Sequence, residues 1–224
     1  MRVISSMATR LLLAELVNLY AQHGGDAVQV ESVGGVDAAK RVQAGEAFDV
    51  VALASNAIDT LIASGHVRPP RVDLVLSGVA VAVRAGATVP DLSSEDAVKA
   101  AVLAAPSLSY STGPSGVALA RLFERWGIAQ QIASRIVQAP PGVPVGSLVA
   151  RGEVALGFQQ LSELLPLEGI TIVGPLPPAI QINTVFSAGV AATCTDADAA
   201  RRCIDFMASD AAAAAKQHHG MEAA

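Results

Sequence analysis

Three segments of the chain place small polar residues or glycines between an apolar, strand-like run and a helix-like run. They are Ser5-Ser6, Gly34-Gly35 and the loop Ser111-Thr112-Gly113-Pro114-Ser115-Gly116. A helix N-terminus leaves backbone N–H groups unpaired and holds about half a positive charge. Glycine gives a ligand access to that backbone, and serine adds a hydroxyl donor. Each junction therefore suits an anion, although one junction alone also serves as an ordinary helix cap.

Two adjacent amides form a second candidate feature. Gln159-Gln160 follows directly on an apolar strand-like run. Side chains at the carboxyl end of a strand face the ligand crevice of an α/β sheet. Helix capping or a solvated surface is the alternative interpretation of this pair.

Other chemistries find little support in the sequence. Phosphate-loop, dinucleotide-binding and Gly-x-Ser-x-Gly motifs are missing. Two histidines lie at helix ends and two near the end of the sequence, so we expect neither a histidine base nor a metal site from His23, His66, His218 and His219. Cys194 and Cys203 are expected to be packing residues, because two cysteines make no disulfide framework. No cofactor is expected.

Composition limits the class of protein. The 224 residues are 52% hydrophobic and 16% charged, which favours one large or two small folded domains over disorder. A net charge of −5 without a basic cluster, and 4% aromatic residues, argue against nucleic-acid binding. No apolar run reaches the roughly 20 residues of a membrane span, so no membrane insertion is expected. The sequence as written shows no signal peptide, which predicts a cytoplasmic protein, or a periplasmic one if a leader was removed.

Alternating β-branched runs and amphipathic windows predict an α/β fold with mostly parallel sheets. The expected strands are Arg2–Ser5, Val28–Glu31, Val50–Ala54, Leu74–Val83, Leu108–Tyr110, Ile132–Gln138, Val154–Phe158, Ile170–Val173 and Asn183–Ala191. Pro69-Pro70 is expected to act as a breaker before the long run Leu74–Val83. The expected helices are Ala8–Gln22, Asp37–Gln43, Ala57–Ala63, Ser94–Ala104, Val117–Trp126, a short one ending at Gly152, Gln160–Leu165, Asp196–Ala208 and Ala211–Gln217. The runs Leu74–Val83 and Asn183–Ala191 are interpreted as crossing strands. They divide the chain into one lobe of residues 1–80 plus 185–224 and a second lobe of residues 81–184, with the ligand cleft between them.

Several segments resemble the molybdate-binding-protein-like family of the type 2 periplasmic-binding-protein fold. They are the opening strand with Ser5-Ser6, Ala44–Val51, Tyr110–Gly116, Leu148–Glu153 and Phe206–Ser209. In that family two lobes close on an oxyanion held by hydroxyls and N–H groups. The resemblance places the family's first oxyanion-binding serine on Ser5 or Ser6, its second near Gly34-Gly35, and its tyrosine on Gln160. It also adds Gly142 and Val143 to the expected site.

The string Gly157-Phe158-Gln159-Gln160-Leu161-Ser162-Glu163-Leu164-Leu165-Pro166 is similar to a branch of this family that includes aconitate isomerase. This resemblance implies an isomerase that moves the double bond of an unsaturated polycarboxylate by a 1,3 proton shift. The alternatives are a non-catalytic solute-binding component of an ABC transporter, which needs export and a permease partner, and a cytoplasmic ligand sensor.

The expected ligand is a small anion. Two glutamines, and glycines where molybdate binders have a serine, favour a planar polycarboxylate over a compact metal oxyanion. Arg71 or Arg84 is a candidate source of one positive charge, and Tyr110, Glu31 or the pocket hydroxyls are candidate bases. The expected ligand-binding set is Ser5, Ser6, Gly34, Gly35, Ser111, Ser115, Gly116, Gly142, Val143, Gln159 and Gln160.

Overall fold

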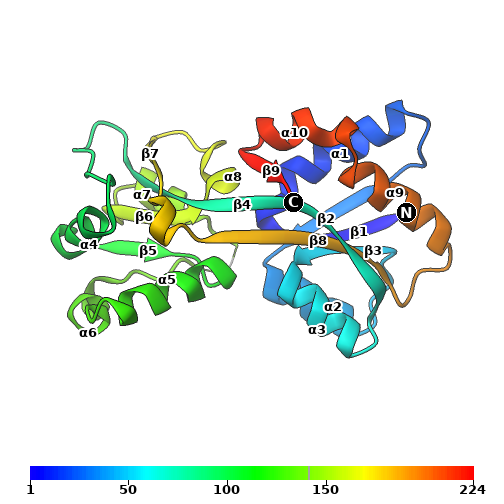
Figure 1. Ribbon diagram of the computed structural model, residues 1–224, viewed down its shortest axis with the longest axis horizontal. Helices are drawn as coiled ribbons and strands as arrows, with labels where there is room; N and C mark the ends of the chain where they lie inside the picture. Colours follow the sequence, from blue (N-terminus) through cyan, green and yellow to red (C-terminus); the bar gives the residue numbers. More distant parts are fainter. Residues whose placement is uncertain (141) are drawn as a thin grey trace. The chain divides into compact units, whose positions relative to one another are not determined.

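The computed structural model describes residues 1–140 and 142–224, and it divides into two compact units. Unit 1 comprises Met1–Ser77 and Thr184–Ala224, and unit 2 comprises Gly78–Asn183. The chain leaves unit 1 along strand β4 (Val67–Arg84) and returns to it at strand β8 (Asn183–Ala191) (Figure 1). Unit 1 is therefore built from both ends of the sequence, and unit 2 from one continuous segment.

The sheet of unit 1 has the strand order β2-β1-β3-β8-β4, and the short strand β9 pairs with β4. Its remaining strands are β1 (Arg2–Ser6), β2 (Gln29–Val33), β3 (Val50–Ala54) and β9 (Met221–Ala223). Strand β1 runs parallel to β2 and β3, whereas β8 is antiparallel to β3 and β9 to β4. The carboxyl ends of β1, β2 and β3 consequently meet at one edge of the sheet.

Helices cover both faces of the unit 1 sheet (Figure 1). One face packs against α1 (Arg10–Gln22), α9 (Ala197–Ala208) and α10 (Ala213–His218), and the other against α2 (Gly35–Gln43) and α3 (Ser55–Ala63). Short 3-10 turns are η1 (Met7–Thr9) and η4 (Asp210–Ala212). Because side chains alternate along a strand, Val3 of β1 packs in the α1 cluster and Ile4 in the α2 cluster.

In unit 2, β4 pairs with β6 (Leu156–Gln160) and β7 (Ile170–Pro175), and β6 pairs with β5 (Leu108–Tyr110). The β5–β6 pair is parallel and both β4 pairs are antiparallel. The carboxyl ends of β5 and β6 therefore also share an edge.

Two groups of helices pack on the unit 2 sheet. One contains α4 (Glu95–Ala104), α5 (Pro114–Arg125) and α6 (Ala129–Ile132), and the other contains α7 (Val145–Ala150) and α8 (Leu161–Leu164). The 3-10 turns are η2 (Ala133–Arg135) and η3 (Pro178–Ile180). Gly157 lets α7 lie close to β6, since a Cβ there would be 2.6 Å from a methyl group of Val149.

The predicted strand Ile132–Gln138 is wrong. Its start belongs to α6 and η2, and only Ile136 forms an isolated bridge, with Leu108. Ile128 and Ile132 are buried one helical turn apart, and Arg135 donates to the carbonyls of Leu103 and Ala105 at the end of α4. The apolar spacing therefore belongs to a helical turn.

Pro69-Pro70 also differs from expectation, because β4 runs through this pair. Both prolines are exposed, so their missing N–H groups leave no buried strand unpaired.

Among the described residues, no helix combines the length and apolar character needed to cross a membrane.

Candidate functional site

The first polar cluster lies in unit 1, where β1 and β2 end. Ser6 is in register with Val33, and Gly34 then caps α2, whose first residue is Gly35. A Cβ added to Gly35 would lie 3.7 Å from the Ser6 Cβ. The Ser6 hydroxyl is 3.5 Å from that of Thr9. Ser6 therefore places a hydroxyl beside the N-terminus of a nine-residue helix, the arrangement expected of an anion-binding junction.

Ser5 lies on the other face of the same strand. Its side chain is fully buried, and its hydroxyl is 2.7 Å from that of Ser32 on β2. It shares its face with Val3, in the cluster that packs against α1. Of the two serines, the structure brings Ser6 to Gly34-Gly35 and ties Ser5 to the neighbouring strand.

A further junction of the same design was missed by the sequence reasoning. Strand β3 is apolar throughout, and α3 begins directly after it with half-buried Ser55 and exposed Asn56. Because β3 is parallel to β1, this helix start lies at the same edge as Ser6. The signal was available in the sequence, since a polar pair follows an apolar strand here too.

The second polar cluster lies in unit 2, around the loop that joins β5 to α5. The hydroxyls of Ser111 and Ser115 are 3.1 Å apart, and Ser115 is buried in the first turn of the 12-residue α5. A Cβ on Gly116 would lie only 1.6 Å from the carbonyl oxygen of Ser111. Gly116 is therefore needed for the loop to fold back on the helix. The three predicted residues of this loop lie together.

Gln159 and Gln160 point to opposite faces of the unit 2 sheet. The Gln159 side-chain oxygen accepts a hydrogen bond of 3.1 Å from the backbone N–H of Gly146, at the start of α7. Phe158 packs in the α5 cluster, and by strand alternation Gln160 shares that face. Tyr110 is in register with Phe158, so Gln160 lies two residues beyond this pair, at the carboxyl end of β6. Gln160 thus lies at the same sheet edge as the second cluster, and Gln159 binds the first turn of α7.

Gly142 and Val143 precede α7. Gly142 is exposed and has a φ of 76°, a conformation that favours glycine. The Val143 N–H donates to the Pro140 carbonyl at 3.0 Å, so it closes a local turn. Their predicted contact with a ligand stays a prediction.

Glu163 is a titratable residue that the sequence reasoning did not select. It lies on α8, three residues after Gln160, and its carboxyl forms a hydrogen bond with the Gln159 side chain. Burial raises the pKa of Glu163 to about 7, and the hydrogen bond from Gln159 opposes part of that rise. It belongs to the string Gly157–Pro166, so its position in that string was the available signal.

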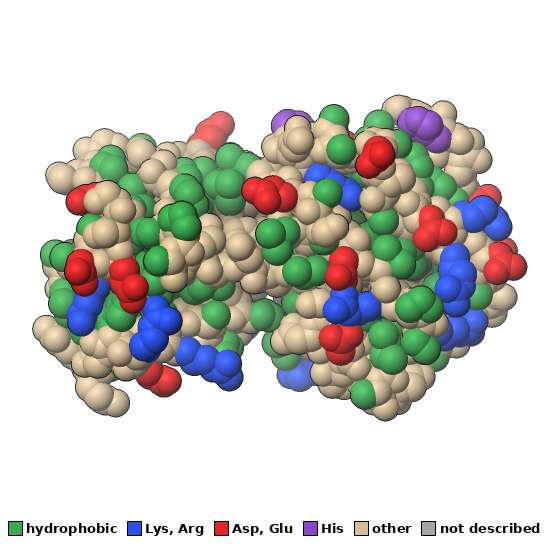
Figure 2. Space-filling view, in the orientation of Figure 1, with side chains coloured by type: hydrophobic (Ala, Val, Ile, Leu, Met, Phe, Trp, Pro, Cys, Tyr) green, Lys and Arg blue, Asp and Glu red, His purple; other side chains and the backbone are tan. Residues whose placement is uncertain are grey.

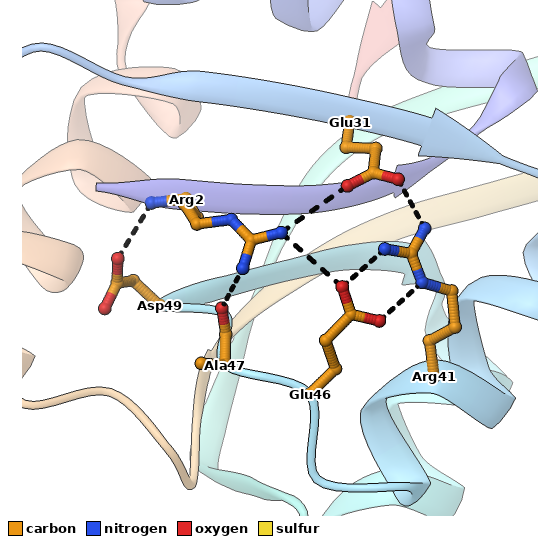
Figure 3. A network of polar contacts seen from close by, with 6 residues as sticks. All are labelled: Arg2, Glu31, Arg41, Glu46, Ala47 and Asp49. Atoms are coloured by element: carbon orange, nitrogen blue, oxygen red, sulfur yellow. Dashed lines mark hydrogen bonds and ion pairs between the residues drawn. The ribbon is translucent and has the colours of Figure 1, made fainter.

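The two named candidate bases are poorly suited to that role. In Figure 3 the Glu31 carboxylate contacts Arg41, with a hydrogen bond of 2.5 Å, and Arg2 at 3.6 Å. The hydrogen bond from Arg41 holds the pKa of Glu31 below its usual value. Burial raises the pKa of the Tyr110 hydroxyl above its usual range. The Glu31 carboxylate is too weak a base, and the Tyr110 hydroxyl does not ionise readily, so neither is suited to abstract a proton near neutral pH.

The two candidate arginines are placed elsewhere. Arg71 is paired with Asp59 and Asp73 and donates to the Ser187 hydroxyl. Arg84 ends β4 against Gly152, beyond the amino end of β6. Arg84 therefore lies at the opposite edge from Ser111 and Gln160, and Arg71 is already neutralised.

The other reactive side chains lie outside both clusters. Cys194 and Cys203 are buried in the unit 1 core, and burial raises the pKa of both thiols, that of Cys203 to about 11. His218 and His219 lie beside Glu15 of α1, so that three side chains able to ligate a metal ion are grouped there. On the face drawn in Figure 2, acidic and basic side chains alternate without a broad basic area.

Comparison with known proteins identifies the family. The model of the family described as bacterial extracellular solute-binding protein matches residues 1–222. The chain belongs to this family of solute-binding proteins. This solute-binding protein is 42% identical over 184 residues to an aconitate isomerase from Pseudomonas sp, a match that covers 81% of this chain and 70% of that one.

Solved structures of other solute-binding proteins show the same fold. A periplasmic molybdate-binding protein of Azotobacter vinelandii matches with a TM-score of 0.80 and 21% identity, over 99% of this chain and 98% of the other. A sulfate-binding protein of Mycobacterium tuberculosis H37Rv gives 0.77 and 17%, over 98% and 85%. The expected type 2 periplasmic-binding-protein fold, of the molybdate-binding-protein-like kind, is confirmed.

Proposed function

We propose that this protein binds a small unsaturated polycarboxylate and isomerises it by a 1,3 proton shift. The observation that supports this most directly is the 42% identity to an aconitate isomerase over 81% of the chain. Such a shift moves a C=C bond without a change in oxidation state, so the proposal needs no cofactor or metal. It needs an anion clamp, a proton-transfer group and exclusion of water.

The two polar clusters supply the clamp in this proposal. Ser6 and the Gly34-Gly35 junction belong to unit 1, and Ser111, Ser115, Gly116 and Gln160 to unit 2. We propose that each cluster binds an anionic group of a ligand. Backbone N–H groups and serine hydroxyls bind carboxylates, and the Gln160 amide both donates and accepts.

The absence of a side chain at Gly35 in unit 1 is our reason for proposing a planar ligand. A tetrahedral oxyanion is best bound by a ring of hydroxyl groups. Gly35 has no side chain, so it adds no hydroxyl beside that of Ser6. The space beside Ser6 therefore fits a flat carboxylate better than molybdate or sulfate. Aconitate is the substrate that we propose.

The second candidate function is that of a non-catalytic binding component of an ABC transporter. The match to solute-binding proteins over residues 1–222 favours it. For both candidates we propose an exported, periplasmic location, because the family is described as extracellular and a structural relative is periplasmic. The comparisons give no support to the cytoplasmic placement.

The experiment incubates the purified protein with cis-aconitate and follows formation of the trans isomer by NMR. Calorimetric titrations with molybdate, sulfate and citrate accompany it. Turnover above the uncatalysed rate supports the isomerase. Tight molybdate or sulfate binding without turnover overturns it and supports the transport component.

A further inference from the structure

Glu163 is held in a fixed position by two successive hydrogen bonds. Its carboxyl binds the Gln159 side chain, and the oxygen of that same side chain accepts from the Gly146 N–H. Gln159 is buried at the end of β6, so the carboxyl is fixed between the strand and α7. Gln159 is thus a positioning residue that joins Glu163 to both elements.

The Glu163 carboxyl lies at the carboxyl end of β6 and remains partly exposed. Helix α8 follows β6 directly, and β6 ends at the same edge as β5, where Ser111 and Ser115 are found. The Glu163 side chain is only partly buried, whereas its neighbours Ser162 and Leu164 are buried. The carboxyl and the second cluster therefore belong to the same edge of the unit 2 sheet.

The surroundings of Glu163 are poor in charge. The sequences of α7, β6, β7 and the unit 2 part of β4 contain one charged residue, Arg84, which lies at the far edge. Burial is the main cause that brings the pKa of Glu163 to about 7. Both the carboxylate and the carboxylic acid are therefore populated near neutral pH, as a group that removes and returns a proton requires.

We propose that Glu163 is the proton-transfer residue of the isomerisation, an inference that rests on the function proposed above. The Glu163 carboxylate takes a proton from the methylene carbon next to the double bond. The C–H electron pair becomes the new C=C bond, and the electrons of the old C=C bond pass to its far carbon. The Glu163 carboxylic acid then protonates that carbon. Substrate and product have the same atoms and electrons, and the residue returns to its starting state.

The test compares Glu163→Gln with the matched control Glu168→Gln, an exposed glutamate five residues further along. Both are incubated with cis-aconitate in D2O, and NMR follows trans-isomer formation and deuterium uptake at the methylene carbon. General acid–base catalysis contributes roughly 10²–10⁴-fold. We expect Glu163→Gln to lower both rates by at least about 100-fold and Glu168→Gln to leave them unchanged. Citrate affinity should change by less than about threefold in both variants, because glutamine keeps the shape and the bond to Gln159.

The outcomes separate the two proposals. If the wild type isomerises aconitate and Glu163→Gln does so at an equal rate, the role of Glu163 is wrong and the function stands. If the wild type neither isomerises nor exchanges deuterium, both proposals fall. If a folded Glu163→Gln protein loses both citrate binding and isomerase activity, Glu163 is a ligand-binding residue and the proton-transfer role is overturned. The kcat of the wild type should rise with pH around 7, and Glu163→Asp should retain part of it.

A separate observation in unit 1 supports a second site. Nδ1 of His218 lies 3.2 Å, and Nε2 of His219 2.9 Å, from the same oxygen of Glu15. One ligand atom from each of the three residues lies within 4.8 Å of the others. Ligands of a tetrahedral zinc ion with bonds of about 2.0–2.1 Å are roughly 3.3 Å apart. The distances from the Glu15 oxygen to the two histidine nitrogens are therefore close to those between the ligand atoms of a zinc ion.

We infer that Glu15, His218 and His219 bind a divalent transition-metal ion of the zinc, nickel or copper class. Two imidazoles and a carboxylate suit these ions, whereas magnesium and calcium prefer oxygen ligands alone. His218 is 74% exposed and Glu15 37%, so water can complete the coordination. The ion would join α1 to the end of α10.

Zinc chloride is the probe, titrated calorimetrically into the full-length protein, with magnesium chloride as the control ion. We expect one zinc per chain, a rise in thermal unfolding temperature, and at least about tenfold weaker binding in His218→Ala, His219→Ala and Glu15→Gln, because mutation even of an outer-shell partner costs roughly 10–100-fold in metal affinity. His66→Ala is the matched control and should bind as the wild type does. Equal zinc binding by the double variant His218→Ala/His219→Ala, or an equal response to magnesium, would overturn the site.

Discussion

Ser6 and Gly35 face each other where β1 ends and α2 begins, with 3.7 Å between the Ser6 Cβ and the position of a Cβ on Gly35. The glycine therefore determines how much room and how many hydroxyls this cluster offers. A single β-carbon fits at ordinary van der Waals contact, so the position can be varied without disturbing the fold.

Gly35→Ser should alter ligand preference. The added hydroxyl supplies the second donor that suits a tetrahedral oxyanion and narrows the space for a flat carboxylate. We expect molybdate to bind roughly 10-fold more tightly, as one added charge-assisted hydrogen bond of about 1.5 kcal/mol implies, and citrate to bind more weakly because its space is reduced. Calorimetry measures both, with Val36→Ser on the exposed side of the same helix as control. Unchanged affinities for both ligands would remove Gly35 from the site.

Ser115→Ala should weaken anion binding, because the hydroxyl lost is buried at the start of α5 beside Ser111. A charge-assisted hydrogen bond contributes about 1–3 kcal/mol, which corresponds to roughly 5–150-fold in Kd. Citrate titration checks this, and exposed Ser134→Ala serves as control. An affinity equal to that of the wild type would mean that the loop is only a helix cap.

Glu163 should make stability depend on pH. The pKa of Glu163 is raised from 4.5 to about 7 on folding. The stability that its protonated carboxyl contributes is therefore fully present below pH 4.5 and is lost as the pH rises to about 7. At 1.36 kcal/mol per pKa unit, the loss is at most on the order of 3 kcal/mol. Urea unfolding at several pH values should show it as the difference between wild type and Glu163→Gln. A difference that is constant from pH 4.5 to 8 would contradict the assigned environment.

Ser109→Ala should cost no stability. The Ser109 hydroxyl on β5 is fully buried, and within the described part of the chain no hydrogen-bond partner contacts it. Removing an unsatisfied buried hydroxyl is expected to be neutral or to stabilise by about 1 kcal/mol. Thermal and urea unfolding measure the change. Destabilisation by more than about 1 kcal/mol would show that the hydroxyl has a bound partner such as water.

The sequence predicted the elements whose local pattern is unambiguous. Strands Val50–Ala54, Leu108–Tyr110 and Asn183–Ala191 have the predicted bounds, because each is a short apolar or β-branched run between breakers. Ile132–Gln138 failed because a buried helical turn and a strand look alike over so few residues.

The site was harder to predict, because it depends on strand faces and distant contacts. Because side chains alternate along a strand, Ser5 and Ser6 point to opposite faces, as do Gln159 and Gln160. The sequence does not say which residue of each pair faces the helix N-terminus. The contact between Glu15 and His219 joins residues 204 positions apart. No local pattern contains it.

The division of the chain also orders events during synthesis. Strand β3 pairs with β8, whose residues follow the whole of unit 2 in the sequence. A nascent chain can therefore complete unit 2 while the edge of β3 is still unpaired, and unpaired strand edges promote aggregation. Slowing translation through residues 78–183 should lengthen that exposure and increase the need for a chaperone that shields β3 until β8 emerges.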